Sequence, residues 1–282
     1  MSFDRIGPDL PLLPVVLSVP HAGRAFPPTL ETPSRVDLDQ LISLEDRYAD
    51  LLVNDAAQSG FSGLVARTPR AIIDLNRAEQ DLDPTMVTPA PVRPPPLSTK
   101  ARGGLGLVPR RTAALGEIWT RKFSAAEIEQ RLTDHHRPYH ETLAALLAAA
   151  KARHGAALLL DIHSMPPLAD TAEGKAPDLV IGDRFGRSAD PRLSDHVRAF
   201  AQDWGLRTAR NAPYAGGHIL DRHGAPHRQI HALQIEFDRR LYLEPNLVAP
   251  AGRASELARF VTALAQSLAD ELSGASALLA AE

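Results

Sequence analysis

Two histidines, His21 and His163, each stand at the end of a short apolar segment of the chain. If those segments are strands of one open sheet, their ends are the place where ligands collect. A catalytic zinc ion takes three protein ligands and keeps a fourth position for water. The 282-residue chain has no cysteine, so the ligands of such an ion must be imidazole and carboxylate groups. One histidine alone is more often an ordinary buried imidazole, but the pair predicts part of a metal site.

The carboxylates between Glu45 and Asp50 are the candidates for the third ligand. Asp46 and Asp50 are four residues apart, and we expect them to share one face of a helix at residues 46–58. One of them would bind the metal and the other would orient a histidine. Both assignments stay open at this point.

Asn76 and Arg77 follow residues 71–75, an apolar segment that we predict to be a strand. An arginine fork beside an amide suits bidentate binding of a carboxylate, so this pair predicts an anionic substrate. A structural ion pair between Arg77 and an aspartate such as Asp46, Asp50 or Asp183 is the alternative. Arg70, at the entrance to the same segment, would polarise a scissile carbonyl or stabilise its oxyanion.

Glu236 closes another apolar segment, at residues 231–237. Beside a metal, this carboxylate would take the proton of an attacking water and deliver it to the leaving nitrogen. Taken alone, a glutamate at a strand end is more often part of a solvated edge.

The elements that must position these groups are short apolar strands that alternate with helices. Strands are predicted at residues 15–19, 64–66, 71–75, 157–162, 178–181 and 231–237, and helices at 46–58 and 254–272. Another helix begins at Ser124, where Glu127 completes a capping box. Pro138 either kinks that helix or opens the next one, which runs to His154. Strands that are mostly continuously apolar favour an α/β fold with a largely parallel or mixed sheet covered on both faces.

We predict one domain over residues 1–282, with a proline-rich excursion at about residues 83–112. His136 and His140 share a helix face if the helix is continuous, which would suit a second metal site. An alanine-rich helix also needs polar residues on its solvent side, and we favour that interpretation. Arg137 and Tyr139 are kept as pocket residues.

Composition and charge limit the class of partner. The apolar share of 44% and the charged share of 23% are ordinary for a globular protein. A net charge of −3 gives a nucleic-acid partner no electrostatic support. No window approaches the ~18 continuous apolar residues of a membrane span. We expect a cytoplasmic protein with a small-molecule partner, and the sequence carries no indication of its oligomeric state.

Six motifs together resemble the N-formylglutamate amidohydrolase family, in order and spacing, from about residue 14 to about residue 245. They are residues 18–23 (SVPHAG), 74–77 (DLNR), 161–166 (DIHSMP), 182–183 (GD), 211–217 (NAPYAGG) and 231–236 (HALQIE). The DLNR motif is also similar to one in aspartoacylases and succinylglutamate desuccinylases, whose fold is zinc-carboxypeptidase-like.

The resemblance implies a three-layer α/β/α fold with a central mixed sheet, zinc-carboxypeptidase-like or phosphorylase/hydrolase-like, with one zinc ion per chain. It implies His21 and His163 as ligands, and Glu236 as general base and acid. The carboxypeptidase relatives carry His-x-x-Glu, whereas Arg24 stands at that offset from His21. The carboxylate ligand must therefore come from further along the chain, and the family favours Asp46 or Asp50.

The same resemblance implies hydrolysis of an N-formyl or other N-acyl amino acid, such as N-formylglutamate, to formate and the free amino acid. Asn76 and Arg77 would hold the substrate carboxylate, and Arg70 would lie near the carbonyl. The loop at residues 211–217 would close over the amide through Asn211, Tyr214, Gly216 and Gly217.

Two other functions are weighed against this one. A binuclear manganese ureohydrolase would need an acid two residues after His163, and Met165 stands there. A catalytically inactive ligand-binding relative is the other alternative, although the chain keeps every candidate catalytic group.

Overall fold

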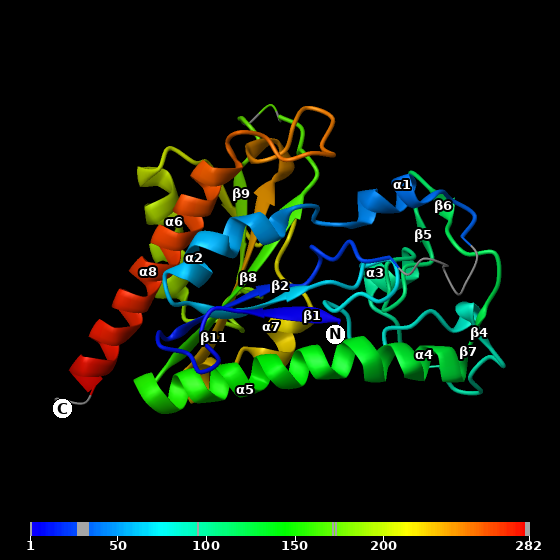
Figure 1. Ribbon diagram of the computed structural model, residues 1–282, viewed down its shortest axis with the longest axis horizontal. Helices are drawn as coiled ribbons and strands as arrows, with labels where there is room; N and C mark the ends of the chain where they lie inside the picture. The colour runs from blue at the N-terminus through cyan, green and yellow to red at the C-terminus, as the bar shows by residue number, and fades with distance from the viewer. Residues whose placement is uncertain (1, 27–33, 95, 171, 173, 280–282) are drawn as a thin grey trace. The chain divides into compact units, whose positions relative to one another are not determined.

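The computed structural model describes residues 2–26, 34–94, 96–170, 172 and 174–279 (Figure 1). The chain forms two compact units. The first unit comprises Met1–Asp4, Pro20–Arg47 and Ala66–Glu141, and the second comprises Arg5–Val19, Tyr48–Val65 and Thr142–Glu282. The expectation of a single domain stays a prediction.

The centre of the second unit is a mixed sheet of seven strands (Figure 1). In spatial order they are β1 (Phe3–Ile6), β3 (Ser62–Ala66), β2 (Val15–Val19), β8 (Ala157–Met165), β11 (Ile230–Asp238), β9 (Leu179–Gly182) and β10 (Thr208–Arg210). Strand β2 is parallel to β3 and β8, and β8 is parallel to β11. Strand β9 runs antiparallel to β11 and parallel to β10. The prediction of an α/β fold with a central mixed sheet is confirmed.

The central strands are buried along their whole length. Every residue of β2 and of the nine-residue β8 is buried, which explains why their sequences are mostly apolar instead of alternating. Both strands were predicted from that pattern. His163 and Glu236 were expected at or just after the end of a strand, and each lies inside one, two residues before its end.

Helices of the second unit cover this sheet. The helical segment begins with a 3-10 turn, η2 (Ala49–Val53), and continues as α2 (Asn54–Gln58). The other helices are α6 (Pro191–Asp203), α7 (His218–His223) and α8 (Ala254–Leu279), with short 3-10 turns η5 (Pro226–Arg228) and η6 (Arg239–Leu241). Helix α8, red in Figure 1, lies against α2, α6 and β2, and α7 packs on β11.

The apolar spacing of α8 explains its place. Leu257, Val261, Leu264 and Leu268 recur every three or four residues, and all are buried. Phe260 adds an edge-on ring contact with Phe237 of β11. No helix within the described residues combines the length and the apolar content that crossing a bilayer requires.

The first unit holds the proline-rich excursion and has only short elements before its long helix. These are α1 (Leu38–Leu41), η1 (Ile42–Leu44), η3 (Pro84–Met86), β4 (Val87–Thr88), α3 (Thr99–Arg102), β5 (Arg111–Thr112), β6 (Gly116–Glu117) and β7 (Phe123–Ser124). Helix α4 (Ala125–Arg131) then continues through a π-helical turn, Leu132–His136, into α5 (Arg137–His154), whose residues from Thr142 on belong to the second unit. The predicted capping box is present, because Ser124 Oγ accepts from the Glu127 amide and the Glu127 carboxylate accepts from the Ser124 amide.

Two predicted elements are wrong. Residues 71–75 form turns and no strand, because Pro69 starts a turn closed by the Ile72 amide and the Asp74 amide donates to the carbonyl of Leu107. The apolar run there reflects burial, and tertiary contacts override its strand propensity. The predicted helix at 46–58 begins later, at Ala49. Tyr48 has a φ of 61°, so Asp46 and Asp50 do not share a helix face.

Candidate active site

Strand register places Glu236 beside His163. The two residues are partners on the parallel strands β11 and β8, so their side chains leave the same face of the sheet. Both are buried, with exposed fractions of 8% for Glu236 and 2% for His163. A buried carboxyl group and a buried imidazole therefore lie next to one another in the second unit.

A carboxylate fixes the orientation of the His163 ring. Asp161 stands two residues earlier on the same strand face, and its Oδ2 lies 2.8 Å from Nε2 of His163. The other oxygen, Oδ1, accepts a 2.6 Å hydrogen bond from Ser18 Oγ on the neighbouring strand β2. With Nε2 as the donor to this carboxylate, Nδ1 would keep the lone pair that a metal needs.

Glu236 has a hydrogen-bond partner on its own strand. Gln234, two residues earlier, donates its side-chain amide to Oε1 of Glu236 over 2.9 Å. This hydrogen bond fixes one oxygen of the carboxyl group in place.

His21 has a similar carboxylate partner in the first unit. Its Nε2 lies 2.7 Å from Oδ1 of Asp74, and its Nδ1 lies 3.5 Å from Oδ2 of Asp46. The backbone amide of Asp46 also donates to the carbonyl of His21 over 2.9 Å. All three side chains are buried. His21 therefore turns its Nδ1 towards the carboxylate of Asp46.

Asp74 accepts hydrogen bonds from several polar groups of the first unit. Besides His21, it accepts hydrogen bonds of 2.8 Å from Arg70 Nε and from the Asn76 amide. Burial by itself raises the pKa of Asp74, but the charges of Arg70 and Arg77 and the interaction with His21 outweigh it and hold this pKa well below its usual value. Asp74 is therefore ionised, as the orientation of His21 requires.

Arg77 is almost fully buried, and burial lowers its pKa. Its Nε donates to the carbonyl of Leu105 over 2.8 Å and its Nη1 to the carbonyl of Asn76 over 2.9 Å. Its ion-pair neighbour in the first unit is Asp74, at 3.9 Å. Asp183, one of the partners considered from sequence, is paired with Arg210.

The loop at residues 211–217 is tied to β9. Asn211 donates its side-chain amide to Oδ1 of Asp183 over 2.7 Å and accepts from the Asp183 amide over 3.1 Å. A Cβ on Gly182 would lie 2.8 Å from the backbone of Ala215 and of Gly216, so only glycine fits there. The roles of Asn211, Tyr214, Gly216 and Gly217 in substrate binding stay predictions.

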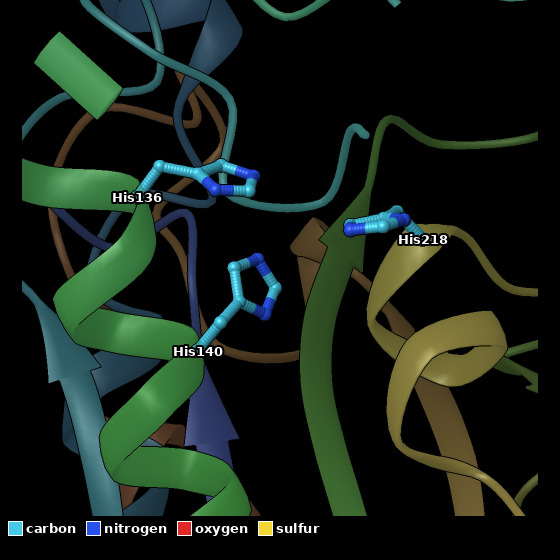
Figure 2. Close-up of side chains that lie close together, drawn as sticks. All are labelled: His136, His140 and His218. Atoms are coloured by element: carbon cyan, nitrogen blue, oxygen red, sulfur yellow. The ribbon is translucent and has the colours of Figure 1, made fainter. Parts of the chain in front are cut away.

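Two groups of histidine and aspartate side chains among the described residues have the composition to hold a metal ion. One is His21, Asp46 and His163, all buried, and the other is His136, His140 and His218 (Figure 2). Asp50 belongs to neither group. His136 and His140 have no exposed surface, so the interpretation that they serve the solvent side of their helix is wrong.

Sequence reasoning assigned no role to Asp74 and Asp161, although both lie in the quoted motifs. For Asp161 a local signal existed, because residues two apart on a strand share a face and Asp161 precedes His163 by two. For Asp74 no local signal existed, since its contact with His21 spans 53 positions of the chain.

Comparison with known proteins gives one consistent assignment. The family model described as N-formylglutamate amidohydrolase matches residues 13–243. N-formylglutamate deformylase from Pseudomonas aeruginosa is 29% identical, with 92% of each chain covered. The protein of that name from Pseudomonas putida is 32% identical, with 82% of each chain covered. The crystal structure of N-formylglutamate amidohydrolase from Ralstonia eutropha JMP134 matches with a TM-score of 0.88 and 32% identity, covering 96% of this chain and 98% of that one. Because the family model extends over most of its length, this chain belongs to the N-formylglutamate amidohydrolase family.

Proposed function

We propose that this protein is a zinc-dependent amidohydrolase that cleaves the amide of N-formylglutamate, or of a closely related N-formyl amino acid, to formate and the free amino acid. The names of its relatives support the substrate. The observation that carries the chemistry is the register pair of Glu236 with His163, whose ring is oriented by Asp161.

The donor set fits one zinc ion. His21 and His163 each have Nε2 held by a buried aspartate, which is the support that zinc-binding histidines usually receive. Asp46 is the third proposed ligand, because its carboxylate lies beside Nδ1 of His21, and Asp50 is set aside. Imidazole and carboxylate donors are the zinc ligands open to a chain without cysteine. Zinc at these residues would lower the pKa of water and polarise an amide carbonyl.

Glu236 is the proposed general base and general acid. Its carboxylate takes a proton from the attacking water and returns it to the nitrogen that leaves as the free amine. Gln234 holds one carboxylate oxygen, so the group keeps its orientation through both transfers.

Asn76 and Arg77 are proposed to bind the substrate carboxylate, and Arg70 to stabilise the oxyanion. Two guanidinium groups, those of Arg70 and Arg77, surround the single carboxylate of Asp74 in this segment. The three side chains together keep a positive charge, which attracts an anionic substrate. The loop at residues 211–217 would cover the amide.

The zinc-carboxypeptidase-like arrangement of layers, the cytoplasmic location and a role in amino-acid catabolism belong to the same proposal and follow from the family resemblance. The family assignment disfavours the manganese ureohydrolase alternative. No observation favours an inactive binding protein.

A substrate screen tests the proposal. The zinc-loaded protein is incubated with N-formyl, N-acetyl and N-succinyl derivatives of glutamate, aspartate and leucine, and both formate and free amine are measured. We expect N-formyl-L-glutamate to be cleaved fastest, with formate and glutamate in equal amounts. Binding of these compounds without cleavage would favour the inactive relative. Two manganese ions per chain with cleavage of guanidino compounds would favour the ureohydrolase.

A further inference from the structure

The turn segment that carries Asn76 and Arg77 has no strand partner to hold it. Among the described residues, its backbone hydrogen bonds are those of turns: the Ile72 and Ile73 amides donate to Pro69, the Asp74 amide to Leu107, and the Arg77 amide to Asp74. We propose that His136 and His140 are positioning residues that fix this segment and so orient Asn76 and Arg77 towards the substrate carboxylate. The inference rests on the proposed function of that pair.

The two imidazoles bind the backbone on either side of Asn76. His140 Nε2 lies 3.0 Å from the carbonyl oxygen of Leu75, and His136 Nε2 lies 2.8 Å from the carbonyl oxygen of Arg77. A carbonyl oxygen can only accept, so each Nε2 donates. Because Arg77 Nη1 donates to the carbonyl of Asn76, three consecutive carbonyls each accept a hydrogen bond from a side chain.

The helix that carries His136 and His140 includes a π-helical turn at this contact with the segment. His136 ends the π-helical turn Leu132–His136, and His140 lies one turn later with its ring centroid 4.4 Å from that of His136. Figure 2 shows the two rings on the same side of the helix. Single π-helical turns occur frequently at functional sites.

The same helix contacts the segment at two further points. Arg131 Nη1 donates to the carbonyl of Ile72 over 2.8 Å, and His135 Nδ1 lies 3.1 Å from Thr68 Oγ1. Four side chains of α4, the π-helical turn and α5 thus follow the backbone from Thr68 to Arg77. This row of contacts replaces the ladder of hydrogen bonds that a strand would have had.

A role in packing alone would not need two imidazoles. Both rings are fully buried in a helix whose other buried residues include Leu143, Leu146 and Leu147. Burying a polar ring is unfavourable unless it makes hydrogen bonds, and here those bonds go to the two carbonyls that bracket Asn76. The hydrogen-bonding groups of both rings therefore bind the turn segment that carries Asn76 and Arg77.

The test compares variants that remove the donor with variants that keep it. Leucine in His136→Leu and His140→Leu fills the space and donates nothing, whereas the side-chain amide in His136→Gln and His140→Gln keeps an N–H donor. Glu141→Ala, an exposed position next to His140, is the control. Kinetics of the zinc-loaded enzymes are measured with N-formyl-L-glutamate and with an N-formyl amine that lacks a carboxylate.

We expect the leucine variants to raise KM for N-formyl-L-glutamate by about 10-fold to 100-fold, the scale of a misplaced binding group. Their kcat and their rate with the N-formyl amine should stay close to those of the wild type. The glutamine variants should recover most of the KM. Equal losses on both substrates, or no recovery with glutamine, would assign the histidines a general structural role and overturn the inference. If His136→Leu does not fold, His140→Leu and the two glutamine variants carry the test.

Two further measurements separate this inference from the proposed function. Amide hydrogen exchange of residues 72–79 should accelerate in the leucine variants and not in Glu141→Ala, whether or not the wild type hydrolyses N-formyl-L-glutamate. An inactive wild type with this exchange result would therefore reject the proposed function alone. Metal content per chain should be the same in all variants, and a loss of bound metal in the histidine variants would show that they are ligands and overturn the positioning role.

Discussion

Asp74 and His21 are joined by a hydrogen bond of 2.7 Å between two buried side chains. The pair of Asp161 with His163 has the same chemistry, with a distance of 2.8 Å. In each pair the aspartate lies beside Nε2, which leaves Nδ1 available as the proposed ligand atom. In the proposed metal site, the two aspartates would orient the histidines without binding the ion.

Removing the charge from either aspartate should weaken metal binding. In Asp74→Asn and Asp161→Asn the histidine keeps an acceptor but loses the carboxylate that raises its basicity. We expect zinc affinity to fall by about 10-fold to 100-fold. Competition with a zinc-binding dye measures it, with Asp178→Asn as the control, because the Asp178 carboxylate contacts the guanidinium and the backbone amide of Arg207. Unchanged affinity in both variants would remove these residues from the metal site.

Arg77→Lys should impair substrate binding without removing the positive charge. A lysine cannot donate in the fork geometry that a carboxylate accepts, and it would lose the Leu105 and Asn76 carbonyl contacts. We expect KM for N-formyl-L-glutamate to rise by at least about 10-fold, the scale of one lost charged hydrogen bond. Arg121→Lys, at an exposed ion pair with Glu127, is the matched control. Equal KM values for the two variants would reject Arg77 as the carboxylate-binding group.

The stability of the fold should fall in mild acid because of His223. Burial, followed by the charges of Arg222 and His218, lowers the pKa of His223 to about 3. The unfolded chain, with a histidine pKa near ~6.5, therefore binds one more proton between these two values. Stability from this group is complete above about pH 6.5 and is lost as the pH falls below it, by up to about 1.4 kcal/mol per pH unit.

His223→Gln removes this titration. Urea unfolding at pH 7, 6 and 5 should show a smaller loss of the free energy of unfolding in His223→Gln than in the wild type. His227→Gln is the control, at a position with an exposed side chain. Parallel curves for the wild type and His223→Gln would mean that His223 is protonated equally in both states.

Several elements could be predicted from short stretches of the sequence. The buried strands β2 and β8 follow from continuous apolar runs, and the start of α4 follows from the capping box of Ser124 and Glu127. His21, His163 and Glu236 could be singled out because each comes near the end of such a run. These features depend on neighbours in the chain, which is why the sequence alone reveals them.

The predictions that were wrong concern features that depend on contacts between residues far apart in the sequence. Residues 71–75 have the composition of a strand, but they form turns, and their carbonyls at Ile72 and Leu75 bind Arg131 and His140 from a distant helix. The left-handed conformation of Tyr48 separates Asp46 from Asp50, and nothing in the surrounding residue types indicated it. The burial of His136 and His140 depends on packing that the polar character of histidine does not reveal.

The most direct test of the account compares formate release from N-formyl-L-glutamate by the wild type and by Glu236→Gln at equal zinc content. Glutamine preserves the shape of Glu236 but cannot take the proton of the attacking water. We predict one formate per glutamate from the wild type, and a rate at least about 10²-fold lower from Glu236→Gln with unchanged zinc binding. Equal rates for the two proteins, or no formate from the zinc-loaded wild type, would contradict the account.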